Sequence, residues 1–469
     1  MYERKNFWLV IAFLLLNSVT SWAALNGDIE GVVRDTSGAI IPSANVTIIG
    51  VATGAQRTLI SDERGYFIAT QLPIGEYDVR VQLAGFKSSS QRVLVKSAER
   101  ASLNVTLEVG NLAESISVTE TSVQLLNTTD AQLAVSIEEK RVKELPLATR
   151  DPLVLATLAP GVIPVTAANP FLGTGSFNAN GGRGRGNNIT IDNVVSTDVS
   201  TTGGAGFGTL SLDAIQEFKL ITNNFNAEFG RNANAQVQII TKGGSNQFHG
   251  SAYEFLRNDV FNSRDYFDTT GKASILRRNQ FGATAGGAII KEKMFYFGHY
   301  EGLQIRGAAG TRSAKVPTAA QRAAITDPTS AEILKAAGVP AAATDDATGA
   351  FGTVSQSAPV STENNAWSLR IDRNFGDGRD VLSGRYAMQK SKQNSEGNTF
   401  IGTNLSGYGA SSENKPQNFS FSWTRVLQPT VVNEARFAFG RSKPNFSPQS
   451  TAAVPRINIT GMDLSLIHI

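Results

Sequence analysis

Residues 212–256 read LDAIQEFKLITNNFNAEFGRNANAQVQIITKGG and continue without a break as SNQFHGSAYEFL. The first part has a short helix-like start followed by strand-like runs, and the second part alternates in character. Side chains of a strand change face at every residue. The two faces of the second part are His249, Ser251, Tyr253, Phe255 and Phe248, Gly250, Ala252, Glu254, Leu256. This order predicts a small soluble element that leads directly into a membrane β-barrel.

The composition of the 469 residues excludes several classes of protein. Charged residues make up 18% and the net charge is +3, so the chain has no strong field for nucleic acid or anionic lipid. Because there is no cysteine, a disulfide scaffold, a thiol nucleophile and a cysteine zinc site are excluded. The 44 glycines and 25 phenylalanines favour a mainly β chain with many turns. We expect no nucleic acid partner.

Residues 1–23 have the features of an export signal. Arg4 and Lys5 give a positive start, residues 7–16 are all apolar, and Ser21 and Ala23 occupy the small-residue positions before a cut. A membrane anchor helix is the alternative, but this apolar run is shorter than the ~20 residues that span a bilayer. We therefore expect an exported chain that is either soluble outside the membrane or a β-barrel within the outer membrane.

Residues 24–110 predict a β-sandwich. Strand-like runs alternate with turn signals at residues 35–38, 62–65 and 72–75, and about seven strands at this spacing suit a sandwich. The stretches GVVRDTSGAIIPSANVTI and DERGYFIATQLPIGEYDVRVQLAGFK resemble the carboxypeptidase regulatory-like domain. This resemblance implies a carbohydrate-binding-like fold without peptidase chemistry. A spacer and a ligand-binding module both stay open, and we favour the spacer.

Residues 123–244 predict an α+β domain. Residues 137–147 look like a short helix ended by Pro146, and RDPLVLATLAPGV is a second apolar helix-like run. Strands are expected at residues 188–194, within NANGGRGRGNNITIDNVV, and at residues 237–241. The whole order resembles the TonB-dependent receptor plug. It is most similar to the Oar-like group, in which a regulatory-like domain precedes the plug.

This resemblance implies roles for single segments. Residues 189–194 match a core strand, residues 214–219 a helix-to-strand brace, and residues 227–230 a loop before the final strand. The plug motif is carried by Asn180, Gly181, Arg183, Asn188, Asp192, Glu217, Glu228, Gly230 and Lys242.

Residues 111–122 are expected to be an extended linker. In TonB-dependent proteins such a segment is captured by the energy-coupling protein through strand addition, which uses the hydrogen bonds of an unpaired backbone edge. The candidate TonB box is Ile116, Ser117, Val118 and Thr119. A last strand of the preceding domain is the open alternative. The resemblance thus implies a TonB-type energy-coupling protein as a partner.

Residues 245–469 alternate repeatedly and predict about seven strands. The stretches are residues 248–256, 279–289, 294–305, 367–375, 381–388, 419–427 and 431–439. In one of them Trp367, Leu369, Ile371 and Phe375 oppose Ser368, Arg370, Asp372 and Asn374; in another Phe419, Phe421, Trp423 and Leu427 oppose Ser420, Ser422 and Thr424. A soluble sandwich alternates in the same way. The export signal and the plug favour a barrel in outer-membrane lipid, apolar outside and polar inside.

Two parts of this last region interrupt the strand pattern. Residues 307–361 have helical and loop-like composition and are expected to form a long extracellular loop. Residues 464–469, LSLIHI, match the translation of a sequencing adapter and are expected to be an artefactual tail. Plugged transporters need about 22 strands, so we expect the chain to be a C-terminally truncated fragment with only the N-terminal strands of a transmembrane antiparallel barrel.

Other chemical interpretations have little support. The glycine run at residues 181–186 lacks the ending of a phosphate loop. Arg183 and Arg185 are interpreted as loop or wall contacts and not as a nucleic acid site. His249, His299 and His468 have no partners at metal-ligand spacing. We expect no catalytic residue, metal or cofactor, and thus no enzyme.

The sequence therefore predicts an outer-membrane TonB-dependent receptor or transporter. The resemblance implies capture of an external ligand by outward loops and the plug, and translocation when the inner-membrane complex pulls on the periplasmic side. The ligand stays open among siderophore, carbohydrate, peptide and protein, since a fold does not fix a function. The alternative from another class is an exported adhesion or carbohydrate-binding protein that transports nothing.

Overall fold

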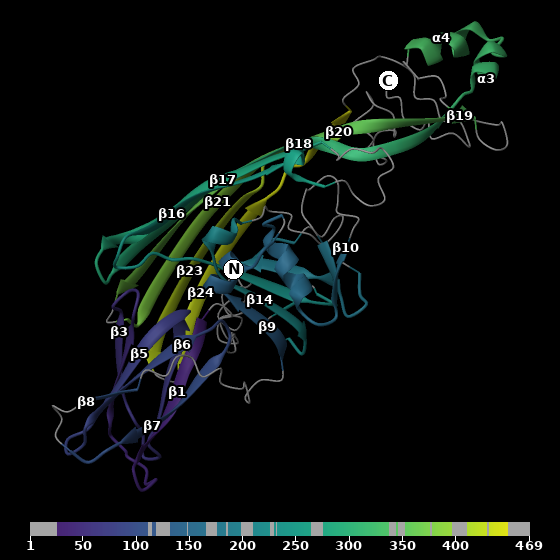
Figure 1. Cartoon of the computed structure of the whole chain (residues 1–469). Coiled ribbons are helices and arrows are strands. Elements are labelled where there is room, and N and C mark those ends of the chain that lie inside the picture. Colours follow the sequence, from purple (N-terminus) through teal and green to yellow (C-terminus); the bar gives the residue numbers. More distant parts are fainter. Residues whose placement is uncertain are drawn as a thin grey trace, which may run out of the picture.

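The computed structural model describes residues 26–110, 115–118, 132–147, 149–165, 176–183, 186–197, 210–225, 229–230, 232–263, 275–336, 344–345, 352–375, 378–395, 410–428 and 431–448. The expected export signal, Glu228, Arg185, His468 and the expected tail lie outside these residues. Figure 1 shows three parts: an N-terminal sandwich (residues 26–110), a central domain (residues 132–244) and a long curved sheet. In the described part of the chain, no helix has the length and apolarity that a membrane span requires.

The sandwich has the seven strands that its turn signals predict. They are β1 (Asn26–Asp35), β2 (Asn45–Gly50), β3 (Gln56–Ile60), β4 (Tyr66–Pro73), β5 (Gly75–Gln82), β6 (Ser88–Val95) and β7 (Arg100–Leu107). One sheet has the order β4-β1-β7 and the other β3-β2-β5-β6-β8, where β8 is Ser115–Val118. Alternate residues such as Ile29, Val46 and Phe67 fill the core between the sheets.

The turns of the sandwich form for a repeated reason. The Asp35 carboxylate accepts the backbone N–H of Ser37 at 2.8 Å and of Ala39 at 2.9 Å. The Asp62 carboxylate accepts those of Arg64 and Tyr66, both at 2.8 Å. An aspartate that bonds its own turn in this way leaves the next glycine free to take a positive φ.

The central domain is an α+β unit built on one sheet. Its elements are β9 (Leu133–Glu138), α2 (Glu139–Glu144), η1 (Pro152–Leu158), β10 (Val162–Val165), β11 (Ser176–Ala179), β12 (Asn188–Ile191), β13 (Val194–Val195), η3 (Leu212–Ala214), β14 (Ile215–Asn223) and β15 (Gln236–Thr241). The sheet order is β13-β12-β15-β14-β9, and β10 pairs with β11 separately. Phe218 and Leu220 of β14 are fully buried in the core of this domain.

Two expectations for this domain are wrong in detail. The helix expected at residues 137–147 is limited to Glu139–Glu144, because Ile137 pairs with Phe218 in the sheet and tertiary pairing overrides local propensity. The second apolar run is helical as expected, and forms the 3₁₀ helix η1 with Asp151 as its cap. The strand expected at residues 188–194 is a hairpin, with Asp192 and Asn193 at φ values of 47° and 62° between β12 and β13.

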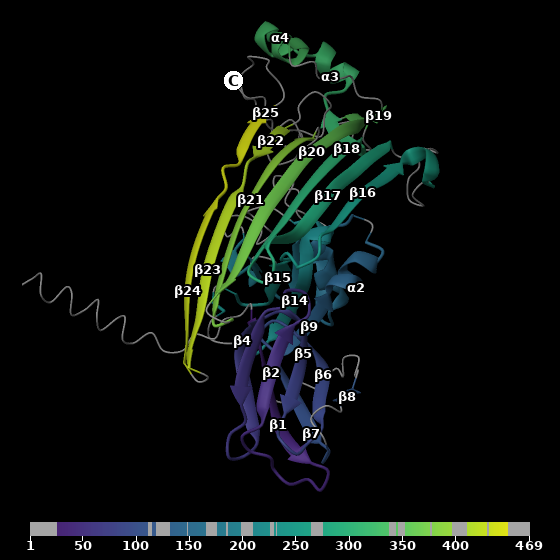
Figure 2. The same cartoon turned by 90° about the vertical axis from the view of Figure 1, so that its left-hand side faces the viewer.

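The long sheet contains the seven predicted strands as long antiparallel neighbours. They are β16 (His249–Asn258), β17 (Leu276–Ile290), β18 (Met294–Val316), β20 (Gly352–Phe375), β21 (Asp380–Ser395), β23 (Gln417–Gln428) and β24 (Val431–Arg441). The short strands β22 (Ala410–Asn414) and β25 (Asn445–Pro448) continue β23 and β24 along the same edge. Figure 2 shows the sheet curving around the central domain, with the sandwich beneath both.

The two faces of the long sheet differ as the alternation predicts. On β20 the side chain of Leu369 is 44% exposed, whereas its neighbour Ser368 is 5% exposed and faces inward. On β23 Phe421 is exposed on the outside, and Ser420 and Thr424 are buried. On these strands the outer face is therefore mainly apolar and the inner face mainly polar, apart from Phe295 and Phe297 of β18, which are buried on the inner side; this is the arrangement of a barrel wall in lipid.

The expected loop at residues 307–361 is too long. Strand β18 continues to Val316 and β20 begins at Gly352, and Val316 pairs with Gly352. The connection holds α3 (Ala319–Ala323), α4 (Pro328–Ala336) and β19 (Thr344–Asp345). The hairpin extends because strand pairing uses backbone groups, so it continues where the apolar alternation that marks a membrane strand has stopped.

Two glycines of the sandwich turns provide a matched test of this fold. A Cβ added to Gly65, at φ +65°, would lie 2.7 Å from the carbonyl oxygen of Val33, whereas one added to Gly38, at φ +87°, meets nothing within 4 Å. We expect Gly38→Ala to lower the free energy of unfolding by about 1 kcal/mol and Gly65→Ala by about 3 kcal/mol, because only the second adds a clash to the positive φ. Native-state hydrogen exchange of β1 and β4 amides in the intact protein measures both; equal effects would contradict the described turn.

Candidate functional site

Charged groups on the inner face of the long sheet bind the central domain through Asp192. Arg385 of β21 places Nε 2.5 Å from Oδ2 of Asp192, and Arg370 of β20 places Nη1 3.7 Å from Oδ1. The Thr241 backbone N–H donates to Asp192 at 2.9 Å and its hydroxyl at 2.8 Å. The hairpin turn between β12 and β13 thus places the Asp192 carboxylate against two arginines of the long sheet, which we call the wall.

The rest of this cluster completes the pairing of Arg370. Its Nε donates to both carboxylate oxygens of Asp372, at 2.9 and 3.1 Å, and its Nη1 donates to the carbonyl oxygen of Thr241 at 2.7 Å. Burial on its own would raise the pKa of Asp192. The charges of Arg385 and Arg370, with the Thr241 bonds, outweigh burial and hold that pKa below its ordinary value.

A second cluster lies against β16. Arg150 Nη2 is 2.5 Å from Oδ2 of Asp213, and the guanidinium lies over the ring of Phe255 with 4.0 Å to its centroid. The hydroxyl of Tyr253 is 2.7 Å from Ser211 Oγ and donates to Glu301 Oε2 at 2.7 Å. Polar contacts therefore fix the central domain to the wall at two separate places.

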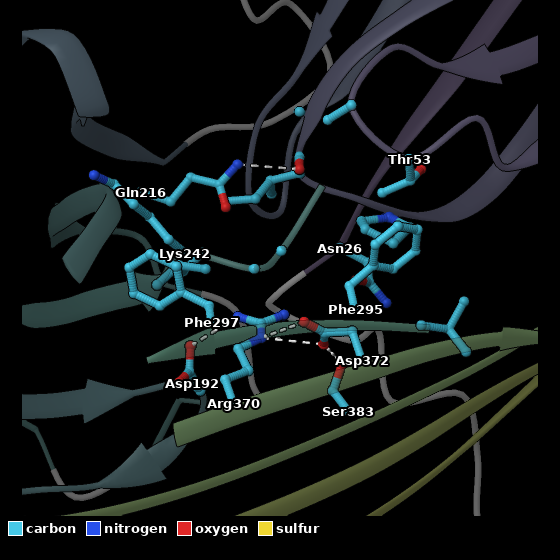
Figure 3. Close-up of a pocket in the computed structure, with 18 of the residues that line it drawn as sticks. Asn26, Thr53, Asp192, Gln216, Lys242, Phe295, Phe297, Arg370, Asp372 and Ser383 are labelled. Atoms are coloured by element: carbon cyan, nitrogen blue, oxygen red, sulfur yellow. Dashed lines mark hydrogen bonds and ion pairs between the residues drawn. The ribbon is translucent and has the colours of Figure 1, made fainter. Parts of the chain in front are cut away.

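A cavity of about 590 Å³ lies where the sandwich, the central domain and the long sheet meet. Figure 3 shows Asn26 and Thr53 on the sandwich side, Gln216 and Lys242 on the central domain, and Arg370 on the wall. The cavity is thus bounded by all three parts of the chain.

Lys242 lies at the edge of this cavity. Its Nζ donates to the carbonyl oxygen of Asp213 at 2.6 Å and lies 3.0 Å from Oε1 of Glu139. Burial lowers its pKa to about 8, against the opposing effect of Glu139. Its side chain connects the start of α2 to the end of β15.

The structure describes eight of the nine plug-motif residues, all except Glu228, and places them at several positions in the central domain. Asn188 donates to Gln236 at 2.9 Å and to the carbonyl oxygen of Gly230 at 3.4 Å, inside the central domain. Asn180 and Gly181 form a positive-φ turn after β11, and the carbonyl of Arg183 accepts a bond from Asn234. These contacts are internal to the domain.

Asp192, Glu217 and Lys242 are the motif residues that face another part of the protein. Asp192 binds the wall, Lys242 lines the cavity, and Glu217 binds the sandwich, with its Oε2 3.1 Å from the backbone N of Ser97. Burial raises the pKa of Glu217, although a bond from Ser136 and the charge of Lys219 oppose this.

Sequence reasoning missed several of the groups that hold the central domain against the long sheet. Arg370 was placed on the polar face of its strand but was given no role, and Arg150, Arg385 and Asp213 were not selected. The available signal was an arginine at an inward position of an alternating strand, because a buried charge needs a carboxylate partner.

Another expectation concerns the linker at residues 111–122. Residues 115–118 pair in parallel with β6 as the edge strand β8, so the open alternative of a last strand describes their position here. The role of residues 116–119 as a TonB box stays a prediction.

The histidines contact single polar side chains: His299 bonds Ser368 at 2.6 Å and His249 lies near Ser245. Among the described residues, no three His, Cys, Asp or Glu side chains are grouped so as to hold a metal.

The Asp192 cluster makes a prediction about stability and pH. We expect Asp192→Asn to destabilise the contact between the central domain and the wall by about 3–5 kcal/mol, because two buried arginines lose a partner. Because the folded pKa is lowered, this stabilisation is complete above about pH 4 and is lost as the pH falls through the folded pKa. Hydrogen exchange of the β12–β13 hairpin measures the effect. The control Asp78→Asn removes an exposed pair with Arg92, and an equal loss of protection in the control would refute the assignment.

Comparisons with known proteins agree with this architecture. Residues 28–108 match the model of the carboxypeptidase regulatory-like domain, and residues 240–465 match that of the outer membrane beta barrel domain. The TonB-dependent transporter Oar of Myxococcus xanthus is 27% identical over 313 residues, which cover 63% of this chain and 28% of that protein.

Solved structures have lower similarity. The outer membrane transporter YddB from Escherichia coli has a TM-score of 0.44 and 12% identity, over 66% of this chain and 38% of that one. The siderophore receptor PirA from Acinetobacter baumannii has a TM-score of 0.37 and 13% identity, over 70% and 50%. From the domain matches and the curated relative, the chain carries a carboxypeptidase regulatory-like domain and an outer membrane β-barrel domain, and it is a homologue of the TonB-dependent transporter Oar.

Proposed function

We propose that this chain belongs to a transporter of the outer membrane, in which the central domain is the plug of the barrel. The observation that carries the proposal is the sidedness of β20. Leu369 and Ile371 of this strand are exposed on the outer face, whereas Arg370 between them reaches Asp192 of the central domain. A wall that is apolar outside and bonded to a domain inside is suited to a plugged pore and not to a soluble sheet.

The proposed work of the transporter follows from the two polar clusters. A plug that is fixed to the wall by buried ion pairs blocks the lumen, and opening a path requires those contacts to be broken. Binding of an external ligand shifts the plug only as far as its differential affinity allows. We therefore propose that a TonB-type coupling protein supplies the remaining work by pulling on residues 116–119. The ligand is a siderophore, carbohydrate, peptide or protein.

Localisation is tested by fractionation of the protein expressed from its own gene. We expect an outer-membrane species that migrates faster on gels before heating, because a folded barrel resists detergent. Leu369→Arg places a charge on the lipid face, at a cost of about 2–4 kcal/mol near the midplane, and should reduce the folded species strongly. Thr329→Arg, in the exposed helix α4, is the control. A water-soluble or shed protein would instead support the adhesion or carbohydrate-binding alternative.

Energy coupling is tested at the candidate TonB box. Proline lacks a backbone N–H, so Ser117→Pro should prevent strand addition. We expect binding to the purified periplasmic domain of a TonB-type protein to weaken at least about tenfold, a change of 1.4 kcal/mol in binding free energy. Thr121→Pro, outside the box, is the matched control. Unchanged binding by the Ser117→Pro variant would remove these residues from the coupling step.

A further inference from the structure

The sandwich is attached to the central domain by a buried polar contact that we name the latch: Ser97 and Glu99 of the sandwich with Glu217 and Lys219 of β14. Lys219 Nζ donates to the carbonyl oxygen of Ser97 at 2.6 Å and lies 3.3 Å from Glu99 Oε1. The backbone N–H of Ser97 donates to Glu217 Oε2 at 3.1 Å. The side chains of Glu217 and Lys219 are almost wholly buried, at 3% and 1% residue exposure.

A second attachment joins the sandwich to the end of the long sheet. The backbone N–H of Asn246, just before β16, donates to the carbonyl oxygen of Ala52 at 2.9 Å, and its side chain donates to that of Thr53 at 2.7 Å. Arg57 reaches the turn before β21, where Nη2 donates to the carbonyl oxygen of Gly378 at 3.0 Å. The sandwich therefore contacts both the central domain and the end of the long sheet.

The cavity of about 590 Å³ is lined by Arg57 and Gly378 of the second attachment and by Gln216, the neighbour of Glu217 in the latch. Thr53 and Arg57 belong to its sandwich side, Lys242 to the central domain, and Phe295 and Ser422 to the long sheet. Figure 3 shows the loops of the sandwich across the cavity from the strands of the wall. With the sandwich in this position, one side of the cavity is covered by it.

The chemistry of the attachments is that of a separable contact. Permanent interfaces are large and apolar, whereas contacts between domains that move are more polar. The hydrogen bonds of the latch can be replaced by bonds to water once the domains part. A buried ion pair is also weak evidence for net stability, although it fixes one orientation.

Two residues of the latch belong to the sheet of the central domain. Glu217 and Lys219 lie on β14, which pairs with both β9 and β15 in the central sheet. A rearrangement of that sheet therefore moves the two charges away from Ser97. The sandwich is thus placed to respond when the central domain rearranges.

We propose that the regulatory-like sandwich is a gate over this cavity, closed by the latch and by the contact at Asn246, which opens when the central domain rearranges. A polar ligand that has passed between the central domain and the wall then leaves through the space that the sandwich vacates. This inference rests on the proposed transport function. It replaces the interpretation of the sandwich as a spacer.

The gate is tested by the reactivity of a cysteine in the cavity, since the chain has none of its own. Ser422→Cys in the purified intact protein is labelled with fluorescein maleimide, with and without the double change Glu217→Gln and Lys219→Met. We expect labelling at least about tenfold faster in the double variant. A loss of 1.4 kcal/mol in the free energy that docks the sandwich raises the undocked population tenfold. Thr36→Cys, on an exposed turn of the sandwich, should label at one rate in both backgrounds.

A lock provides the opposite test. The backbone N–H of Asn246 donates to the carbonyl oxygen of Ala52 at 2.9 Å, so cysteines at these two positions are chosen to form a disulfide. Oxidised Ala52→Cys with Asn246→Cys should slow labelling at position 422, and a reductant should restore it, as read by peptide mass spectrometry. Unchanged labelling in the lock would overturn the gate even if the latch variant failed to fold. Failure of the transport proposal would appear separately, as a protein absent from the outer membrane.

Discussion

Two arginines that face inward from neighbouring strands of the wall require a buried negative charge, and Asp192 supplies it. The carboxylate lies 2.5 Å from Arg385 and 3.7 Å from Arg370, and its charge offsets the cost of burying these two guanidinium groups. The arrangement of the central domain follows from this need. Its hairpin turn has two residues at positive φ, which brings the aspartate to the end of a tight two-strand unit at the wall.

Polar contacts have the same part in every junction of the molecule. The central domain meets β16 through Arg150, Asp213 and Tyr253, and it meets the sandwich through Glu217 and Lys219. The two apolar cores stay separate, one inside the sandwich and one inside the central domain. Hydrophobic burial therefore builds the sandwich and the central domain, and ion pairs and hydrogen bonds join the parts to one another.

Local sequence patterns were sufficient to predict the three parts of the chain, but not the contacts between them. The turn signals at Asp35 and Asp62 predicted the sandwich because each aspartate bonds its own backbone. The alternation around Leu369 predicted the faces of the wall because strand geometry has a period of two. The helix expected at residues 137–147 failed in its first turn, where pairing with β14 outweighed helix propensity. Asp192 was selected through a resemblance, but Arg385 was not, because a partner 193 positions away in the chain leaves no local pattern.

The extension of β18 and β20 has a mechanical consequence. Beyond Gly307 strand β18 has no further pairing with β17, and before Val360 strand β20 has none with β21. Among the described residues, the outer part of this hairpin pairs only through its own two strands and the short β19, and an isolated two-stranded ribbon is marginally stable in water. This part of the hairpin extends beyond the other strands of the sheet (Figure 1). A bend at the root of this hairpin would displace the helices α3 and α4 more than any part of the sheet, because they lie at its far end.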